Sequence, residues 1–317
     1  MRAIIEGSRP RQMIKNGLVL VPLFFTVNIW FSTSDLSGMT TIVVKAFAAL
    51  GIFILLSAAI YLFNDSVDVE KDRLHPKKKF RPIASGKISV HKAYAVSLLM
   101  MIAALAASLY ISSPMILTSG LYLIINVAYT YWLKNIVILD VMTIASGFVL
   151  RAMAGSIAID QTTIIQNNVP TEVALTISPW LYVVTALGAL FIALAKRRNE
   201  LHLAGSNSPA QRPILNDYSI ALLDNLINVV AAATLIAYTF YTFSTGISEA
   251  NVPSNHSMML TIPFVAYGVL RYLYLIHIDE VGETPEEIVI RDKPLLINIL
   301  LWLVTGSSVL MWTRLSI

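Results

Sequence analysis

Nine apolar stretches, each about the length of one membrane crossing, constrain this chain more than any other feature of its sequence. A helix needs roughly 20 apolar residues to cross the hydrocarbon core of a bilayer. The pattern therefore predicts an all-α, polytopic membrane protein with nine transmembrane helices, organised as a single integral membrane domain over residues 1–317. The stretches are 14–33, 41–63, 93–112, 114–132, 136–158, 179–195, 219–245, 258–278 and 295–316.

The composition excludes the other broad classes of protein. Hydrophobic residues make up 56% of the chain and charged residues 13%, whereas a soluble domain is typically about 25% charged. Disorder requires low hydrophobicity and high net charge, which is the opposite balance. There is no cysteine, which excludes disulfides and thiolate chemistry, and the five histidines are scattered, which argues against a zinc or haem site.

The basic residues indicate how the chain is oriented. Most of the 23 lie before the first apolar stretch or in alternate connections, above all 64–92, whereas the connections 34–40, 159–178 and 246–257 have none. Lysine and arginine concentrate in cytoplasmic loops, so we expect the N-terminus and the 64–92 loop to be cytoplasmic. Because these charges lie at membrane ends rather than on one soluble face, membrane lipid is the expected partner and nucleic acid is not.

Three aspartates directly after the second apolar stretch are the strongest indication of chemistry. On a helix with 100° per residue, Asp65, Asp68 and Asp72 lie within about 60° of one another, with Asn64 beside them. Carboxylates on one stripe repel unless a cation lies between them, and Mg²⁺ prefers such oxygen ligands together with water or substrate phosphate. We predict that the three aspartates bind Mg²⁺ and act in catalysis. The alternative is a solvated helix end whose acids pair with nearby lysines.

A basic segment follows the acids. Residues 75–87 read HPKKKFRPIASGK, so cations and a Ser-Gly turn come directly after the carboxylates. This order is typical of a site for a phosphate-rich, Mg²⁺-chelated substrate, and we predict that Lys77, Lys79 and Arg81 bind substrate. Arg81 is the best candidate, since a guanidinium can hold phosphate with two hydrogen bonds. The alternative is a basic loop that only follows the charge rule and binds anionic lipid.

Together these residues resemble a known motif. Asn-Asp-x-x-Asp-x-x-x-Asp at 64–72, followed by Arg-Pro-x-x-Ser-Gly at 81–86, is similar to the first aspartate-rich motif of the UbiA-type prenyltransferase superfamily. The resemblance implies nine helices around a central cavity that opens to the cytoplasmic side, where a Mg²⁺-diphosphate binds. It places the protein in a bacterial inner (plasma) membrane, with the active site cytoplasmic.

One departure from the superfamily pattern indicates a particular branch. Most members carry a second aspartate-rich motif after the sixth helix, but this chain reads KRRNEL at 196–201. That stretch resembles the Lys-Arg-x-x-Glu-Leu of the polyprenyl-phosphate phosphoribosyltransferase branch. The segments 9–16, 129–134 and 146–155 agree with the same branch. The residues assigned to substrate on these grounds are Lys15, Asn64, Tyr129, Lys134, Arg151, Lys196, Arg197 and Glu200.

The positions of several ionisable residues, apart from any resemblance, also indicate function. Asp140 and Arg151 lie inside a predicted span, where ionisable groups are costly and functional by default; the alternative is that other buried partners neutralise them. Lys196 and Glu200 are four residues apart, which is also the spacing of an ordinary surface ion pair. With Arg197 and Arg198 they are predicted to form a basic patch that faces the aspartates and binds phosphate.

The resemblance implies Mg²⁺-dependent transfer of 5-phosphoribosyl from phosphoribosyl pyrophosphate to a polyprenyl (decaprenyl-type) phosphate, for cell-envelope glycolipid or arabinan precursors. The first alternative is a UbiA-type enzyme that joins a prenyl diphosphate to an aromatic acceptor. A secondary transporter would show paired repeats, and none is evident. A lipid-binding scaffold would not need three aligned carboxylates. The oligomeric state stays open, a homo-oligomer included.

Overall fold

The structure is a computed structural model in which membrane-length helices dominate. Eight helices of the described residues are long and apolar enough to cross a membrane, so the expected all-α membrane fold is confirmed. They are α4 (Leu36–Val67), α6 (Val90–Ile111), α7 (Ser113–Tyr131), α8 (Leu139–Ile159), α9 (Pro179–Ala204), α11 (Ile220–Phe243), α12 (Ile262–Ile278, preceded by η6, Ser257–Thr261) and α14 (Lys293–Leu315). The structure describes residues 2–31, 35–76, 78–160, 162–166, 169–173, 179–204, 213–244, 252–278, 288 and 291–315.

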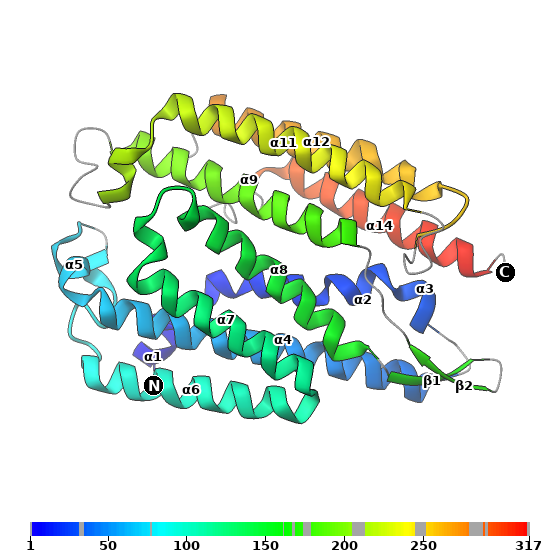
Figure 1. Cartoon of the computed structure of the whole chain (residues 1–317), viewed down its shortest axis with the longest axis horizontal. Helices are drawn as coiled ribbons and strands as arrows, with labels where there is room; N and C mark the ends of the chain where they lie inside the picture. The colour runs from blue at the N-terminus through cyan, green and yellow to red at the C-terminus, as the bar shows by residue number, and fades with distance from the viewer. Residues whose placement is uncertain are drawn as a thin grey trace.

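The first predicted span, 14–33, is not one continuous helix, so the count of nine is not confirmed. The chain there forms a 3₁₀ helix, η1 (Pro10–Leu20), and then two short helices, α2 (Val21–Phe25) and α3 (Val27–Trp30). Proline cannot donate a backbone hydrogen bond, and Pro22 lies where η1 gives way to α2. A 3₁₀ segment this long is uncommon. The broken segment still contacts α4 and α8 within the bundle (Figure 1).

The shorter elements lie at the two ends of the bundle (Figure 1). At one end are α1 (Arg2–Gly7), α5 (Val69–Leu74) and the basic segment with η2 (Lys78–Phe80). At the other end, an antiparallel hairpin pairs β1 (Thr162–Gln166) with β2 (Val169–Val173), in register from Thr162–Val173 to Gln166–Val169. The basic 64–92 loop and the described residues of the 159–178 connection, which has no lysine or arginine, therefore lie at opposite ends, as the charge pattern predicts. Two further 3₁₀ turns are η3 (Leu133–Asn135) and η5 (Pro213–Asp217).

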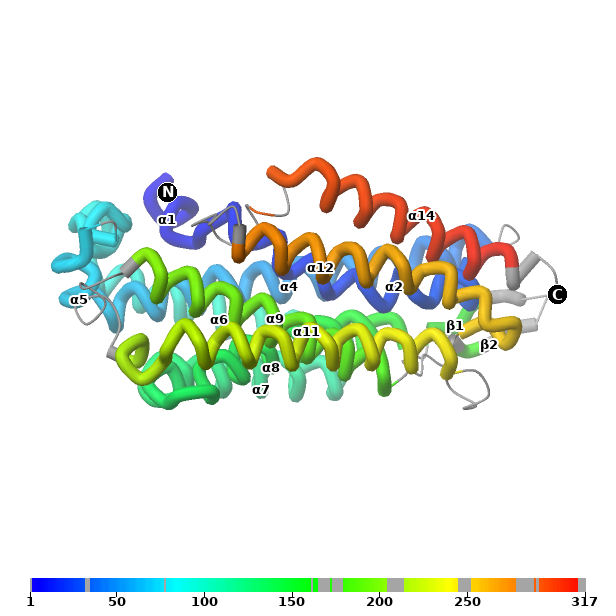
Figure 2. The backbone as a smooth tube through the Cα atoms, turned by 90° about the horizontal axis from the view of Figure 1, so that it is seen from above, coloured from blue at the N-terminus to red at the C-terminus, as the bar shows by residue number. Residues whose placement is uncertain are grey.

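Side-chain caps fix where several spans begin. Asp35, Ser89, Ser112 and Ser219 precede α4, α6, α7 and α11, and each accepts a hydrogen bond from the backbone N–H three residues later. Such caps satisfy N–H groups that have no partner within the helix. The outer helices expose apolar side chains, as α6 does with Leu98, Leu99 and Ile102. Figure 2 shows α14 at the outside of the bundle, beside α12.

Gly155 of α8 permits the close approach that brings η1 against the core. A Cβ built on Gly155 would lie 1.9 Å from the carbonyl oxygen of Val19, far inside van der Waals contact. Only glycine fits where two backbones meet this closely. This contact holds η1 against α8, where the side-chain oxygen of Asn16 accepts a hydrogen bond from Arg151.

We expect Gly155→Ala to lower the thermal stability of the protein in detergent. The added methyl group must push η1 away from α8, and overpacking of this kind costs about 1–3 kcal/mol. Gly188→Ala is the matched control, because Gly188 also lies in a long helix but a Cβ added there would meet no neighbouring atom within 4 Å. Thermal unfolding followed by fluorescence-detected size-exclusion chromatography should separate the two variants. Equal midpoints would contradict the close contact.

Candidate active site

The aspartate motif lies at a break between two helices. Helix α4 ends at Val67 and α5 begins at Val69, with Asp68 between them at φ −90°, ψ 11°. The amide of Asp68 still donates to the carbonyl of Asn64 at 2.9 Å, so the break is a bend rather than a loop. Because of this bend, the three aspartates do not share one environment as predicted. Asp65 and Asp72 are buried, whereas Asp68 is half-buried and pairs with Lys134.

Arg81 joins two of the aspartates. Its Nη1 lies 3.1 Å from Oδ1 of Asp65 and 2.5 Å from Oδ2 of Asp72. The guanidinium of Arg9 donates to the same Asp65 oxygen and lies 4.8 Å from the centre of the Tyr61 ring. Two arginines from segments outside α4 therefore hold the buried carboxylates, one from the N-terminal segment and one from the basic segment.

The end of α7 and the following turn η3 hold the rest of the motif. Lys134 Nζ lies 2.8 Å and 2.9 Å from the two carboxylate oxygens of Asp68. The Thr130 hydroxyl donates to the side-chain oxygen of Asn64. The structure thus brings the predicted residues Asn64, Asp68 and Lys134 together, with Thr130 as an additional contact.

The carboxylate oxygens at the motif are suitable ligands for a hard divalent cation. Within the described ranges, no three acidic or histidine side chains surround one common point. Asp65 and Asp72 nevertheless lie close enough to share a single nitrogen of Arg81. A cation already occupies the position between these two carboxylates, and carboxylate oxygens are the ligands that Mg²⁺ prefers. The two aspartates therefore fit such an ion once Arg81 has moved.

A second ionic network is built around Arg197, which is only 1% exposed. Its Nε donates to Oδ2 of Asp140 at 2.5 Å, and its Nη1 donates to Glu200. Its Nη2 lies 3.4 Å from the Tyr129 hydroxyl. The sequence predicts that Arg197 binds phosphate, and this stays a prediction; in the structure its guanidinium contacts Asp140, Glu200 and Tyr129.

Tyr218 completes this network from the segment before α11. Its hydroxyl donates to Oδ1 of Asp140 at 2.7 Å and accepts from the amide of Ile138 at 2.8 Å. Burial, with a further contribution from the hydrogen bond to Asp140, raises the pKa of Tyr218 to about 12. The hydroxyl therefore keeps its proton near neutral pH and remains a donor to Asp140.

Arg151 lies deeper, on α8, and has a different kind of environment. Its Nε donates to the side-chain oxygen of Asn16 at 2.8 Å, and its Nη2 donates to the Tyr122 hydroxyl at 2.6 Å. Its Nη1 donates to the Gly147 carbonyl at 3.0 Å. In the part of the chain that the structure describes, Arg151 forms no ion pair.

The remaining predicted cations lie in different surroundings. Lys15 is half-buried, and the charges of Lys196, Arg151 and Arg9 are near enough to repel its own. Lys79 is exposed, with its ammonium 5.2 Å from the centre of the Phe80 ring. Lys77 falls outside the described residues.

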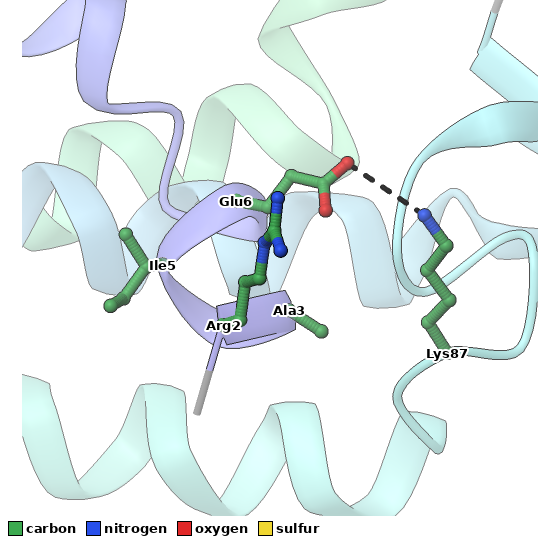
Figure 3. A pocket seen from close by; sticks show the side chains of 5 residues that line it. All are labelled: Arg2, Ala3, Ile5, Glu6 and Lys87. Atoms are coloured by element: carbon green, nitrogen blue, oxygen red, sulfur yellow. Dashed lines mark ion pairs between the residues drawn. The ribbon is translucent and has the colours of Figure 1, made fainter.

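A separate hollow lies beside α1 (Figure 3). It is lined by Arg2, Ala3, Ile5, Glu6 and Lys87, with the Glu6 carboxylate 3.9 Å from Lys87 Nζ. None of these residues belongs to the predicted site. The candidate site is therefore the polar centre of the bundle rather than this hollow.

Comparison with protein families identifies the group to which this site belongs. The model of the UbiA prenyltransferase family matches residues 19–285, which include the aspartate motif and most of the bundle. The chain is a member of the UbiA prenyltransferase family. It is accordingly a membrane-embedded transferase.

Two curated UbiA-family relatives are similar over nearly the whole chain. A decaprenyl-phosphate phosphoribosyltransferase of Mycolicibacterium smegmatis is 33% identical over 96% of this chain and 92% of its own length. One of Corynebacterium glutamicum is 30% identical over 94% of this chain and 84% of its own. A UbiA homologue from Archaeoglobus fulgidus, solved with GPP and Mg²⁺, matches the fold with a TM-score of 0.68 at 18% identity, over 97% of this chain and 99% of its own.

Several residues that build this UbiA-type site are absent from the sequence-based prediction. Arg9, Asn16, Ser57, Tyr61 and Tyr122 all contact predicted site residues or their neighbours. A signal was available for two of them, because Ser57, Tyr61 and Asp65 are spaced four residues apart and share one face of α4. Arg9 and Asn16 lie in the segment 9–16 that resembles the phosphoribosyltransferase branch, yet nothing local shows what their side chains contact.

We expect Asp140→Asn to destabilise the protein strongly. It removes a charge partner of Arg197 while leaving the guanidinium buried, and breaking a buried ion pair in this way costs about 3–5 kcal/mol. Glu70→Gln is the matched control, since Glu70 is exposed and pairs with exposed Arg73 at 2.7 Å; such pairs contribute little. Thermal unfolding in detergent should show a large loss for the first variant only. A similar midpoint for both would show that Arg197 does not depend on Asp140.

Proposed function

We propose that the chain transfers the 5-phosphoribosyl group from phosphoribosyl pyrophosphate to a polyprenyl phosphate of the decaprenyl type, and releases pyrophosphate. The observation that carries the proposal is the similarity over nearly the whole chain to relatives named for this reaction. The site supports it, because carboxylates suited to a divalent ion lie beside several cations suited to phosphates. The Arg197 network also stands where a second aspartate cluster would be expected in a prenyl-diphosphate enzyme.

The residues have distinct roles in this reaction. Asp65 and Asp72, with Asp68 beside them, would hold Mg²⁺, which supplies charge neutralisation for the departing pyrophosphate. Arg81, Arg9 and Lys134 would exchange their carboxylate partners for phosphate oxygens of the donor. Fixed positive groups at the place where charge develops in the transition state are a principal source of catalysis.

The transfer needs no general base. The bond between ribose C1 and the pyrophosphate oxygen breaks, and its electron pair leaves with pyrophosphate. An oxygen of the acceptor phosphate, already anionic, forms the new bond to C1 from the opposite face, so the configuration at C1 inverts. This chemistry suits a site whose described ionisable groups are carboxylates, guanidiniums, ammoniums and tyrosines.

The proposal also includes the orientation of the enzyme in the membrane and the side from which each substrate arrives. The basic end of the bundle, with the aspartate motif, would face the cytoplasm of a bacterial cell, where the water-soluble donor is present. The acceptor would arrive from the plasma membrane, and the product would serve the synthesis of envelope glycolipids. Arg197 is a positioning residue in this scheme.

We expect Asp65→Asn and Asp72→Asn each to lower phosphoribosyl transfer about a hundredfold or more, because each removes a charged ligand for the metal-bound leaving group. Membranes containing the protein would be incubated with radiolabelled phosphoribosyl pyrophosphate, Mg²⁺ and polyprenyl phosphate, and label in the lipid phase would be counted. Glu70→Gln, from the same motif but exposed, should keep normal transfer. EDTA should abolish transfer by the unsubstituted protein.

The choice of donor separates this proposal from a prenyltransferase. We expect label from phosphoribosyl pyrophosphate to enter lipid, and no turnover of a prenyl diphosphate with an aromatic acid under the same conditions. The reverse result would overturn the proposal, because the prenyl chain would then be the group transferred. Product analysis by thin-layer chromatography and mass spectrometry distinguishes the two.

A further inference from the structure

Arg151 is a cation inside the bundle, and among the residues that the structure describes its hydrogen-bond partners are all neutral. It is 7% exposed, and its hydrogen bonds go to Asn16, Ser57, Tyr122 and the Gly147 carbonyl. Its guanidinium also lies 5.0 Å from the Tyr122 ring centre and 5.3 Å from that of Phe148. These contacts fix the orientation of the guanidinium without neutralising its charge.

A charge in this position is expensive unless an anion compensates it. Burying an ion without a counter-charge costs several kcal/mol, and within a membrane span such residues mark functional sites. Lys15 adds to this cost, since its positive charge and that of Arg151 are close enough to repel each other. The described surroundings of Arg151 therefore favour an anionic ligand.

A polar face of α4 connects this position with the aspartate motif. Ser57 lies within 3.5 Å of Arg151, Tyr61 lies beneath Arg9, and Asp65 pairs with Arg9. The three residues are spaced four apart and so lie on one face of the helix. From Ser57 to Asp65 the helix rises about 12 Å, which puts Arg151 farther into the bundle than the carboxylates.

We propose that Arg151, with Tyr122 and Asn16, binds the phosphate of the acceptor lipid, while the aspartate motif binds the diphosphate of the donor. This inference rests on the proposed function. The attacking oxygen must approach C1 opposite the leaving pyrophosphate, and Arg151 lies on the inner side of the motif, away from its basic segment. A lipid phosphate bound there keeps its hydrocarbon tail at membrane depth, whereas the 5-phosphate of the soluble donor gains nothing from that depth.

Direct binding tests the inference without turnover. Purified protein would be heated with farnesyl phosphate or with farnesol, without donor or Mg²⁺, and the unfolding midpoint recorded. We expect the phosphate to raise the midpoint of the unsubstituted protein more than the alcohol does, and Arg151→Gln to abolish that difference. Arg271→Gln is the matched control: Arg271 also lies in a span, on α12, but pairs with Asp292 at 2.7 Å. It should keep the preference for phosphate.

Kinetics identify which substrate Arg151 serves. We expect Arg151→Lys to raise the KM for polyprenyl phosphate about tenfold or more and to leave the KM for phosphoribosyl pyrophosphate within about twofold. A rise confined to the soluble donor would overturn the inference and assign Arg151 to the ribose 5-phosphate. Equal rises for both substrates would also contradict it.

A more conservative variant tests the inference even if the Arg151 variants do not fold. Tyr122→Phe removes the hydroxyl that accepts from Arg151 Nη2 but keeps the ring, and it should raise the same KM by a smaller factor. If the unsubstituted protein shows no phosphoribosyl transfer, the proposed function fails, yet the farnesyl phosphate measurement still tests the anion site. If transfer occurs but Arg151→Gln keeps its preference for phosphate over alcohol, only the inference fails.

Discussion

A charge buried in a bilayer must find a partner inside the protein, and this requirement organises the centre of the bundle. Asp140 and Arg197, both almost completely buried, pair with each other. Tyr218 donates a further hydrogen bond to Asp140, and Glu200 accepts one from Arg197. Asp65 and Asp72 are held by Arg81, and Asp68 by Lys134. Because these contacts join different segments of the chain, they also fix how the spans pack around the site.

The bundle therefore has two kinds of polar region. Around the aspartate motif, negative and positive groups alternate and balance. Around Arg151, one cation is surrounded by amide, hydroxyl and carbonyl oxygens and by two aromatic rings. This asymmetry suits the proposed reaction, in which the donor diphosphate would bring its own divalent ion and the lipid phosphate would not.

Much of this organisation can be predicted from sequence because it is local. Apolar length predicts nine spans, and eight of them are membrane-length helices in the described residues. The aspartate motif is compact enough to recognise within nine residues. Hydropathy predicts the first span as a continuous helix because it does not register the interruption around Pro22. The pairing of Arg151 with Asn16 joins residues 135 positions apart, and no periodicity reveals such a contact. The same limit hides the role of Arg9, whose partner Asp65 lies on another helix.

The shared position of Arg81 between Asp65 and Asp72 has a thermodynamic consequence. A divalent ion that reaches these carboxylates alone must expel a guanidinium that then has no anionic partner. An ion that arrives on a diphosphate supplies that partner in the same event. Under the proposed function, occupancy by metal and by anion would therefore be linked, and each ligand would strengthen the binding of the other by the same factor. Under the proposed function, a metal ion without its diphosphate would leave Arg81 between Asp65 and Asp72.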